Sequence, residues 1–272
     1  MLKDIIMITY KKIEKLRELE EECKQKKIDF FYFFPEKITL ISETLYITDS
    51  REIYLGLKGE RANVLVWVHE ENKNQNFPEA FYVVENIEEI NLKYLEQVYM
   101  RQMKIPWIIT ETKRCIIREM TVEDLDEIYN IYKGKNITKY MEGLYEDREE
   151  EKEFIASYIE HAYKFYGYGT WVIYEKELGV LIGRVGYNLR EGYEDPELGF
   201  VIAERYQNKG YGYECCKAVI AVGKEEYGFE QIQALVKEKN KVSISLCEKL
   251  GLHQKRKVIW EGEEYLYFHM RI

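Results

Sequence analysis

The 272 residues have the composition of a folded globular protein, because 46% of them are hydrophobic and 33% are charged. This balance excludes a disordered or collagen-like chain, and the length suffices for two domains or one large one. The formal net charge of −9 argues against a protein that chiefly binds nucleic acid or an anionic membrane surface, and it favours a cationic or amine-bearing partner.

Cysteine and histidine spacing predicts neither disulfides nor a metal site. The five cysteines are odd in number and lack CxxC spacing, and the four histidines are scattered. The first 30 residues contain no apolar segment of signal-peptide length, and no segment approaches the roughly 18 apolar residues of a membrane helix. We therefore expect a cytoplasmic protein without membrane or nucleic-acid partners, and the sequence is compatible with a homodimer.

Strands alternate with helices over the first 105 residues, which predicts a small three-layer α/β domain with a parallel sheet. Apolar residues at steps of three or four predict an amphipathic helix over 6–22, namely at Ile6, Tyr10, Ile13, Leu16 and Leu19. Further predicted elements are strands at 38–48, 63–70 and 80–85 and helices at 51–59 and 91–103.

The polar segment 69–79 follows an apolar strand, so it is either a ligand-binding loop at the edge of the sheet or a plain connection. Pro106 and the charged pair Lys113–Arg114 indicate a domain boundary near 105–113. We expect a small α/β domain of unknown role over 1–110 and a second domain over 113–272. No Gly/Ser-rich linker separates them.

The second domain has a different order of elements. A strand is predicted at 115–120, and Thr121 with Asp124 three residues later predicts a capping box that opens a helix. The remaining predictions are helices at 149–166, 210–226 and 241–250, a strand pair over 170–188 that turns around Glu177–Gly179, and strands at 196–202, 230–236, 252–260 and 264–271.

A glycine-containing loop, Gln207-Asn-Lys-Gly210-Tyr-Gly212, lies between a predicted strand and a predicted helix. Backbone amides of such a loop and of the first helical turn bind pyrophosphate-like anions, although two glycines here also suit a simple turn. The loop is neither a Walker A loop nor a dinucleotide fingerprint, because it lacks the Gly-Lys-Ser/Thr sequence and the three-glycine spacing.

The loop resembles the Q/R-x-x-G-x-G/A acetyl-CoA loop of the GNAT acetyltransferase superfamily, and Asn240-x-x-Ser243 through Gly251 resembles that superfamily's N-x-x-S-x-x-x-Y-x-K-x-G block. The resemblance covers about 155 residues and is greatest to the ribosomal-protein-alanine-acetyltransferase-like branch. It implies an α/β (α+β) fold in which a mixed, mostly antiparallel sheet is flanked by helices and two central strands splay apart.

The resemblance also implies where acetyl-CoA binds. Backbone groups of Phe200, Val201 and Ile202 would hold the pantetheine arm like an added strand, with an N–H near Val201 facing the thioester oxygen. The loop and the second block would hold the rest of the molecule through Gln207, Asn208, Lys209, Gly210, Tyr211, Gly212, Asn240 and Ser243.

Glu197 and Cys247 are the candidate catalytic residues. Glu197 begins the strand and is either the base that takes the proton of the amine or a carboxylate held in solvent or an ion pair. Cys247 stands where the superfamily often has a tyrosine that protonates the CoA thiolate, and it is either that acid or a buried packing residue. In the latter case water or another tyrosine would supply the proton.

The segment 136–152 between the first two helices is the expected acceptor-covering region, with Tyr140, Glu142 and Tyr145 as candidate substrate contacts. The acidic run 146–151 within it also suits a helix start. The resemblance implies an N-acetyltransferase that transfers acetyl directly from acetyl-CoA to the primary amine of a small molecule or protein, without a metal.

Two alternatives stay open at this point. A GNAT-like domain that binds acyl-CoA as a sensor or scaffold, without turnover, is compatible with Leu235 and Cys247, where some relatives carry a catalytic Glu and Tyr. A haloacid-dehalogenase-like or receiver-like activity of the first domain is suggested by Thr48-Asp49-Ser50 after a strand, but no DxDxT motif precedes it.

Overall fold

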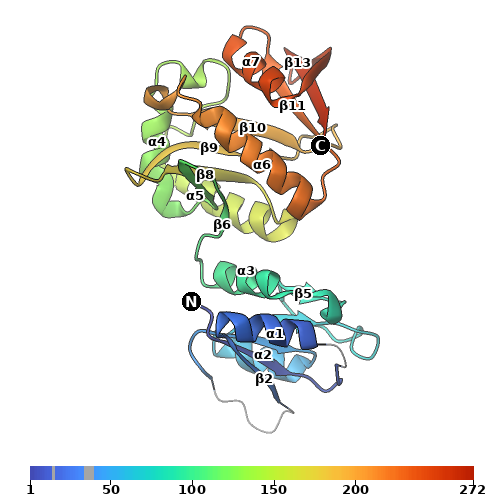
Figure 1. Ribbon diagram of the computed structural model, residues 1–272. Coiled ribbons are helices and arrows are strands. Elements are labelled where there is room, and N and C mark those ends of the chain that lie inside the picture. Colours follow the sequence, from blue (N-terminus) through green and yellow to red (C-terminus); the bar gives the residue numbers. More distant parts are fainter. Residues whose placement is uncertain (14–15, 34–39) are drawn as a thin grey trace. The chain divides into compact units, whose positions relative to one another are not determined.

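The computed structural model describes residues 1–13, 16–33 and 40–272. Within them the chain forms two compact units, Met1–Trp107 and Ile108–Ile272 (Figure 1). Each unit has its own buried core, so each meets the basic physical requirement of a domain.

The described part of the first unit contains a five-stranded parallel sheet with the strand order β2-β1-β3-β4-β5. This is the order of flavodoxin-like doubly wound domains. The parallel α/β prediction for this unit is thereby confirmed. The strands are β1 (Asp4–Ile8), β2 (Asp29–Phe33), β3 (Thr44–Thr48), β4 (Asn63–Trp67) and β5 (Val83–Val84).

Helices cover both faces of this sheet. The helices α1 (Arg17–Lys26) and α3 (Leu92–Gln102) share one apolar core with one face of the strands, and α2 (Arg51–Gly59) shares a second core with the other face. Successive strand residues point to opposite faces, which is why Ile5 and Ile6 belong to different cores. Three layers result, as the sequence predicts.

The predicted helix over 6–22 is wrong. Ile5–Ile8 form the central strand β1, and the helix begins only at Arg17. A strand that is buried on both faces is a continuous apolar run, and its residues match helical spacing by chance. Residues 14 and 15 of this prediction lie outside the described residues.

Other predictions for this unit differ in extent. Strand β3 occupies only the end of the predicted 38–48, of which 38 and 39 lie outside the described residues, and β5 is two residues long instead of six. Strand β2, with the sequence DFFYF, is not predicted at all, because its aromatic residues lie between a helix and a polar segment without clear alternation. The helices at 51–59 and 91–103 are confirmed.

The second unit contains an eight-stranded sheet with the order β12-β13-β11-β10-β9-β8-β7-β6 among its described residues. Its neighbours pair antiparallel except for β10 and β11, which are parallel, so the predicted mixed sheet is confirmed. The strands are β6 (Ile108–Glu111), β7 (Cys115–Arg118), β8 (Thr170–Glu175), β9 (Val180–Asn188), β10 (Glu197–Ile202), β11 (Gln231–Lys237), β12 (His253–Trp260) and β13 (Glu263–Arg271).

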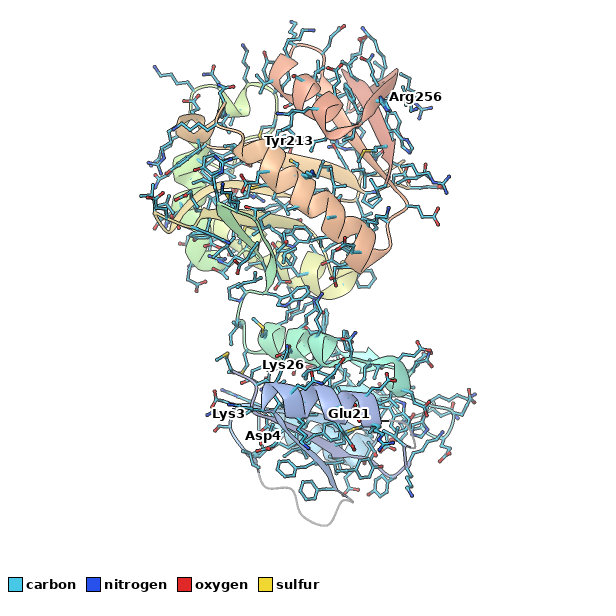
Figure 2. All side chains as sticks on the ribbon, in the orientation of Figure 1. Lys3, Asp4, Glu21, Lys26, Tyr213 and Arg256 are labelled. Atoms are coloured by element: carbon cyan, nitrogen blue, oxygen red, sulfur yellow. The ribbon has the colours of Figure 1, made fainter. Side chains whose placement is uncertain are left out.

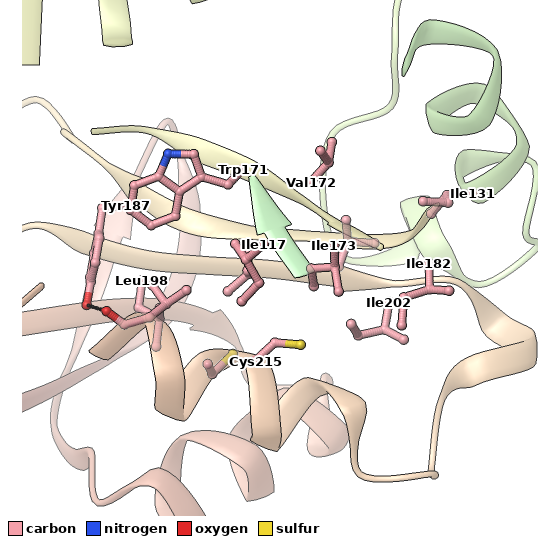
Figure 3. Close-up of a cluster of buried hydrophobic side chains, with 14 of the residues drawn as sticks. Ile117, Ile131, Trp171, Val172, Ile173, Ile182, Tyr187, Leu198, Ile202 and Cys215 are labelled. Carbon is pink, nitrogen blue, oxygen red and sulfur yellow. Dashed lines mark hydrogen bonds between the residues drawn. The ribbon is translucent and has the colours of Figure 1, made fainter. Parts of the chain in front are cut away.

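The longer helices of this unit flank the sheet. Helix α6 carries Tyr213 in its first turn, and β12 carries Arg256 (Figure 2). Cys215 of α6 lies beneath Ile117 and Ile173, whereas Val172 points to the opposite face (Figure 3). The helices are α4 (Leu125–Tyr132), α5 (Arg148–Tyr158), the π-helix Ile159–Tyr166, α6 (Tyr211–Tyr227) and α7 (Lys241–Leu250).

Most predicted elements of this unit are confirmed within one or two residues, including the hairpin around Glu177–Gly179. The capping box of Thr121 and Asp124 is also present, although a short 3₁₀ turn, Val122–Asp124, precedes α4. The single predicted helix over 149–166 divides into α5 and a π-helix. Strand β6 is not predicted, because its residues fall within the predicted domain boundary near 105–113.

Candidate active site

The parallel strands β10 and β11 separate soon after they meet. Glu197 and Gln233 are their recorded register pair, and the Gln233 N–H donates to the Pro196 carbonyl at 3.0 Å. Beyond this pair, β10 continues in register with β9 alone. The backbone groups of β10 that face β11 are therefore open after the first residues, as in the predicted splay.

Strand alternation decides which backbone groups face the opening. The Ala203 N–H donates to the Ile182 carbonyl of β9, so the odd-numbered residues of β10 bond to β9. The backbone groups of Phe200 and Ile202 consequently point toward β11, and those of Val201 point toward β9. Of the three predicted contacts for the pantetheine arm, Phe200 and Ile202 have the suitable orientation.

The loop after β10 is held in a defined shape. The Gln207 side-chain amide donates to the Ile202 carbonyl at 2.8 Å, which ties the loop to the strand end. Asn208 and Gly210 both have positive φ, at 58° and 84°. This left-handed backbone suits glycine, and Gly210 is the N-cap of α6. The N–H groups of the first helical turn, including those of Tyr211 and Gly212, have no hydrogen-bond acceptor within the helix. They are therefore available to an anion.

Arg114 fixes this loop from the neighbouring strand end. Its guanidinium carbon lies 3.9 Å from the centre of the Tyr211 ring, and its Nη1 donates to the Lys209 carbonyl at 3.0 Å. Its Nε also donates to the Glu214 carboxylate at 2.7 Å. The sequence analysis missed Arg114, because it precedes β7, nearly 100 residues before the loop, and belongs to no motif.

Asn240 and Ser243 form the start of α7. The Asn240 side-chain oxygen accepts the Ser243 N–H at 3.2 Å, so Asn240 is the N-cap of the helix. This capping role explains the local Asn-x-x-Ser pattern in physical terms. As contacts for acetyl-CoA, both residues stay predictions.

Cys247 lies inside the core of the second unit, with 1% of its surface exposed. Burial raises the pKa of the Cys247 thiol to about 12, and the nearby Glu248 carboxylate adds to the increase. An acid with so high a pKa is poorly matched to a leaving thiolate whose reference pKa is about 8.5. The geometry thus favours Cys247 as a packing residue.

Glu197 is buried, and both of its carboxylate oxygens accept hydrogen bonds. The Arg190 Nε and Nη2 donate to its two carboxylate oxygens, the latter at 3.0 Å, and the Leu235 N–H lies 3.4 Å from Oε1. The Arg190 guanidinium in turn stacks on the Trp260 ring, with its carbon 3.9 Å from the ring centre. Glu197 therefore lies at the mouth of the splay, covered by a guanidinium.

Other polar residues share this face of the sheet and were missed by the sequence analysis. Gln233 is fully buried, and neither end of its amide has a hydrogen-bond partner among the described residues. Gly199 lacks a side chain, and a Cβ there would lie 3.3 Å from the Asn188 amide nitrogen, so the Asn188 side chain lies close to the backbone at Gly199. Alternation along β10 and β11 is the signal that could have found these residues.

Among the described residues, those of the predicted acceptor segment form no hydrogen bond or ion pair with Glu197. The hydrogen bond with Glu263 raises the pKa of Lys237 at the end of β11, and the negative charge of Glu142 has a smaller effect in the same direction. Tyr145 is half exposed, and its ring packs 5.8 Å from that of Phe154.

Tyr140 of the same segment is partly exposed and contacts its neighbour Lys139, whose Nζ lies 5.2 Å from the ring centre. The acidic run after Tyr145 opens α5, with Asp147 as its N-cap, so the helix-start interpretation of that run is confirmed. A separate cavity of about 350 Å³ lies beside α4 and is lined by Glu127, Asn130, Ile131, Gly134, Val180, Leu181, Ala203, Glu204 and Arg205.

In the first unit, the polar residues after β1, β3 and β4 bind one another. The Asp49 carboxylate accepts the N–H groups of Tyr10 and Lys11 at 2.9 Å each and lies 3.2 Å from the His69 ring nitrogen. Asn72 donates to the Asp49 and Trp67 carbonyls at 2.8 Å. Asp49 is only 3% exposed, so it tethers loops and does not present a carboxylate for phosphorylation.

With this geometry established, the family follows from comparison. A family model described as an acetyltransferase (GNAT) domain matches residues 114–253, slightly more than half of the chain. The chain therefore belongs to the GNAT acetyltransferase family, and the protein is an acyltransferase.

Curated relatives match the same region. YnaD of Bacillus subtilis (strain 168), an uncharacterized N-acetyltransferase, is 29% identical over 159 residues, which cover 57% of this chain and 89% of the relative. YkkB of the same organism is 27% identical over 150 residues, covering 54% of this chain and 86% of the relative.

Solved structures share the fold. A GNAT acetyltransferase from Bacillus anthracis superposes with a TM-score of 0.51 at 21% identity, covering 59% of this chain and 96% of its own. The microcin C7 self-immunity acetyltransferase MccE, solved with acetyl-CoA and AMP, has a TM-score of 0.51 at 14% identity, covering 60% and 94%.

The described part of the chain lacks two features, a membrane-spanning helix and a metal-binding cluster. None of the helices they form combines the length and apolar character that a bilayer crossing requires. They also contain no cluster of three or more His, Cys, Asp or Glu side chains arranged to ligate a metal ion.

Proposed function

We propose that this protein is an N-acetyltransferase that uses acetyl-CoA and transfers the acetyl group directly to a primary amine. The observation that carries the proposal is the opening between β10 and β11 beside the Gln207–Gly212 loop. It combines an unpaired strand edge with a cluster of free backbone N–H groups, which suits an extended amide-bearing arm attached to a pyrophosphate.

The residues present fit acetyl-CoA in distinct ways. The Phe200 carbonyl and the Ile202 N–H would bond to the amides of the pantetheine arm, and the N–H groups from Asn208 to Gly212 would hold the pyrophosphate. Gly210 provides the left-handed backbone that the loop requires, and a Cβ on Gly212 would lie 3.3 Å from Leu246, so glycine there permits close packing of the loop. Arg114 holds the loop in shape through its contacts with Tyr211 and the Lys209 carbonyl, and it adds a positive charge beside the loop.

Bound acetyl-CoA supplies an activated acetyl group as a thioester. In the proposed mechanism, Glu197 accepts a proton from the acceptor ammonium so that the neutral amine can attack the carbonyl carbon. The Phe200 N–H, the first on β10 that is open to the splay, would stabilise the negative charge on the carbonyl oxygen. The C–S bond then breaks, and water protonates the departing thiolate, because Cys247 is buried with a high pKa.

The acceptor is an amine on a small molecule or a protein. Its cationic form suits the acidic segments around the opening, and the name N-acetyltransferase that YnaD and YoaA carry supports transfer to nitrogen. A second candidate function is acyl-CoA binding without turnover. The Arg190 ion pair, which covers Glu197, favours it in one respect, because a covered carboxylate cannot take a proton.

Release of CoA from acetyl-CoA, followed with a thiol reagent across a panel of primary amines, tests the proposal. We expect acceptor-dependent release by the wild type and a loss of about 100-fold in kcat for Glu197→Gln. The exposed Glu177 in the β8–β9 turn provides the matched control Glu177→Gln, which should retain activity. Acetyl-CoA binding without release for any amine would favour the sensor.

A further inference from the structure

The Arg190 side chain lies in a site built for a cation. Its guanidinium is held by the buried Glu197 carboxylate on one side and by the face of Trp260 on the other. Because this site is at the mouth of the splay, we propose that Arg190 occupies the acceptor's own binding site and that an alkylammonium acceptor displaces it. The inference rests on the proposed function and names the substrate class.

The site has the chemistry that an ammonium group on a hydrocarbon chain requires. Glu197 is 5% exposed and so offers a desolvated negative charge. An aromatic face binds cations and packs equally well on methylene groups. The bidentate ion pair would otherwise make the Glu197 carboxylate permanently inaccessible, in conflict with its position beside the strand opening.

Gln233 is an independent indication of a missing partner. It is in register with Glu197 on the neighbouring strand, so the two side chains share a face of the sheet. Its amide oxygen and nitrogen are both buried and lack hydrogen-bond partners among the described residues, which is costly in a folded protein. An ammonium beside Glu197 would donate a hydrogen bond to the Gln233 oxygen.

The charge around the site also selects a cation. The segment 189–197 contains four acidic residues and a single basic one, Arg190. The acceptor segment 136–152 contains six acidic residues and three basic ones. Once Arg190 has moved, the opening is strongly acidic, which raises the local concentration of a cationic acceptor.

Displacement also completes the proton balance of the reaction. The ammonium that replaces Arg190 hydrogen-bonds to Glu197 and gives it one proton, and the resulting amine forms the new C–N bond as the C–S bond breaks. The second proton that the nitrogen loses passes through water to the departing thiolate, so an amide and the CoA thiol are formed. Glu197 returns its proton to solvent, and Arg190 closes on the carboxylate again. Arg190 therefore covers the base when no acceptor is present and sets the requirement for a cation.

The test is binding of n-butylammonium to the full chain, measured calorimetrically with CoA present and without an acetyl donor. Arg190→Ala should bind it about tenfold more tightly than the wild type, because the competing guanidinium is gone. Neutral n-butanol should show no such gain, and Arg190→Ala/Glu197→Gln should lose it. Arg256→Ala is the matched control, because Arg256 stacks on Tyr267 at 5.0 Å without a recorded carboxylate partner.

Arg190→Gln is the second variant, for use if Arg190→Ala does not fold. The glutamine amide can still donate a hydrogen bond to the buried Glu197 carboxylate, which should preserve folding. The inference is overturned if neither folded variant binds n-butylammonium more tightly than the wild type, or if the gain persists without Glu197. Acetyl-CoA titrations of the same variants separate the two proposals. If the wild type does not bind acetyl-CoA, the proposed function is contradicted. If it binds acetyl-CoA but the variants bind n-butylammonium no more tightly than the wild type, only the Arg190 inference is contradicted.

Discussion

Glu197 and Gln233 lie side by side at the point where the parallel strands β10 and β11 part. One carries a buried carboxylate paired with Arg190, and the other carries a buried amide without a partner among the described residues. A strand opening, a base and an unsatisfied hydrogen-bonding group thus coincide within one register pair. This coincidence relates the fold to the proposed chemistry.

Arg114 is expected to support acetyl-CoA binding through the shape of its loop. Arg114→Ala removes the stack on Tyr211 and the hydrogen bond to the Lys209 carbonyl. We expect the Kd for acetyl-CoA to rise roughly tenfold, or about 1.4 kcal/mol, with little change in kcat. Arg114→Lys should recover only part of the affinity, because it restores the charge without the planar fork. An unchanged Kd in calorimetry would contradict this role.

Cys247→Ala should leave turnover within about threefold of the wild type. Proton donation from a thiol with a pKa of about 12 to a thiolate of about 8.5 is uphill by roughly 5 kcal/mol, so the thiolate should leave unprotonated and take its proton from solvent afterwards. The same variant should lose about 1 kcal/mol of unfolding free energy, because a small buried side chain is shortened. A kcat loss of about 100-fold with retained acetyl-CoA binding would instead assign the acid to Cys247.

Asp124 links strand β7 to the start of α4, and its stability contribution should depend on pH. Burial opposes its ionisation, but hydrogen bonds from Arg118, the Thr121 backbone and Tyr174 outweigh burial and hold the pKa of Asp124 below its ordinary value of 3.8. A lowered folded-state pKa stabilises the native state above the ordinary value and loses that effect as the pH falls through the folded value.

We therefore expect Asp124→Asn to cost about 2–4 kcal/mol in urea unfolding at pH 7, because Arg118 loses its bidentate partner. The difference between the wild type and the variant should shrink below pH 4. A difference that stays constant between pH 7 and pH 3 would show that the charge of Asp124 is not the cause. Asp126→Asn, on the exposed side of α4, is the matched control.

The sequence was sufficient for the second unit because its elements carry local signals. The capping box at Thr121, the turn at Gly179 and the Gln207–Gly212 loop each depend on residues close in sequence. The first unit was predicted less well, because a central parallel strand such as Ile5–Ile8 has no periodicity that separates it from a helix.

The missed site residues share one physical property, which is that their role depends on distant partners. Arg190 and Trp260 are 70 residues apart and meet only because β12 folds back beside the β9–β10 connection. Arg114 and Tyr211 are separated still further. Short-range patterns cannot identify such pairs. Glu197 was predicted from its place at a strand start, with a base or a carboxylate in solvent or an ion pair as the open alternatives, but nothing in the sequence identified Arg190 as its partner.

The most direct test of the account is the shift in thermal unfolding that saturating acetyl-CoA produces in the wild type, in Gly210→Asp and in Gly179→Asp. Both glycines have positive φ, at 84° and 63°, but Gly179 lies in the β8–β9 turn. At 100 times its Kd the ligand stabilises the native state by about 2.7 kcal/mol, or several degrees. The account predicts this shift for the wild type and Gly179→Asp and its loss in Gly210→Asp, whereas no shift in the wild type, or an equal shift in all three proteins, would contradict it.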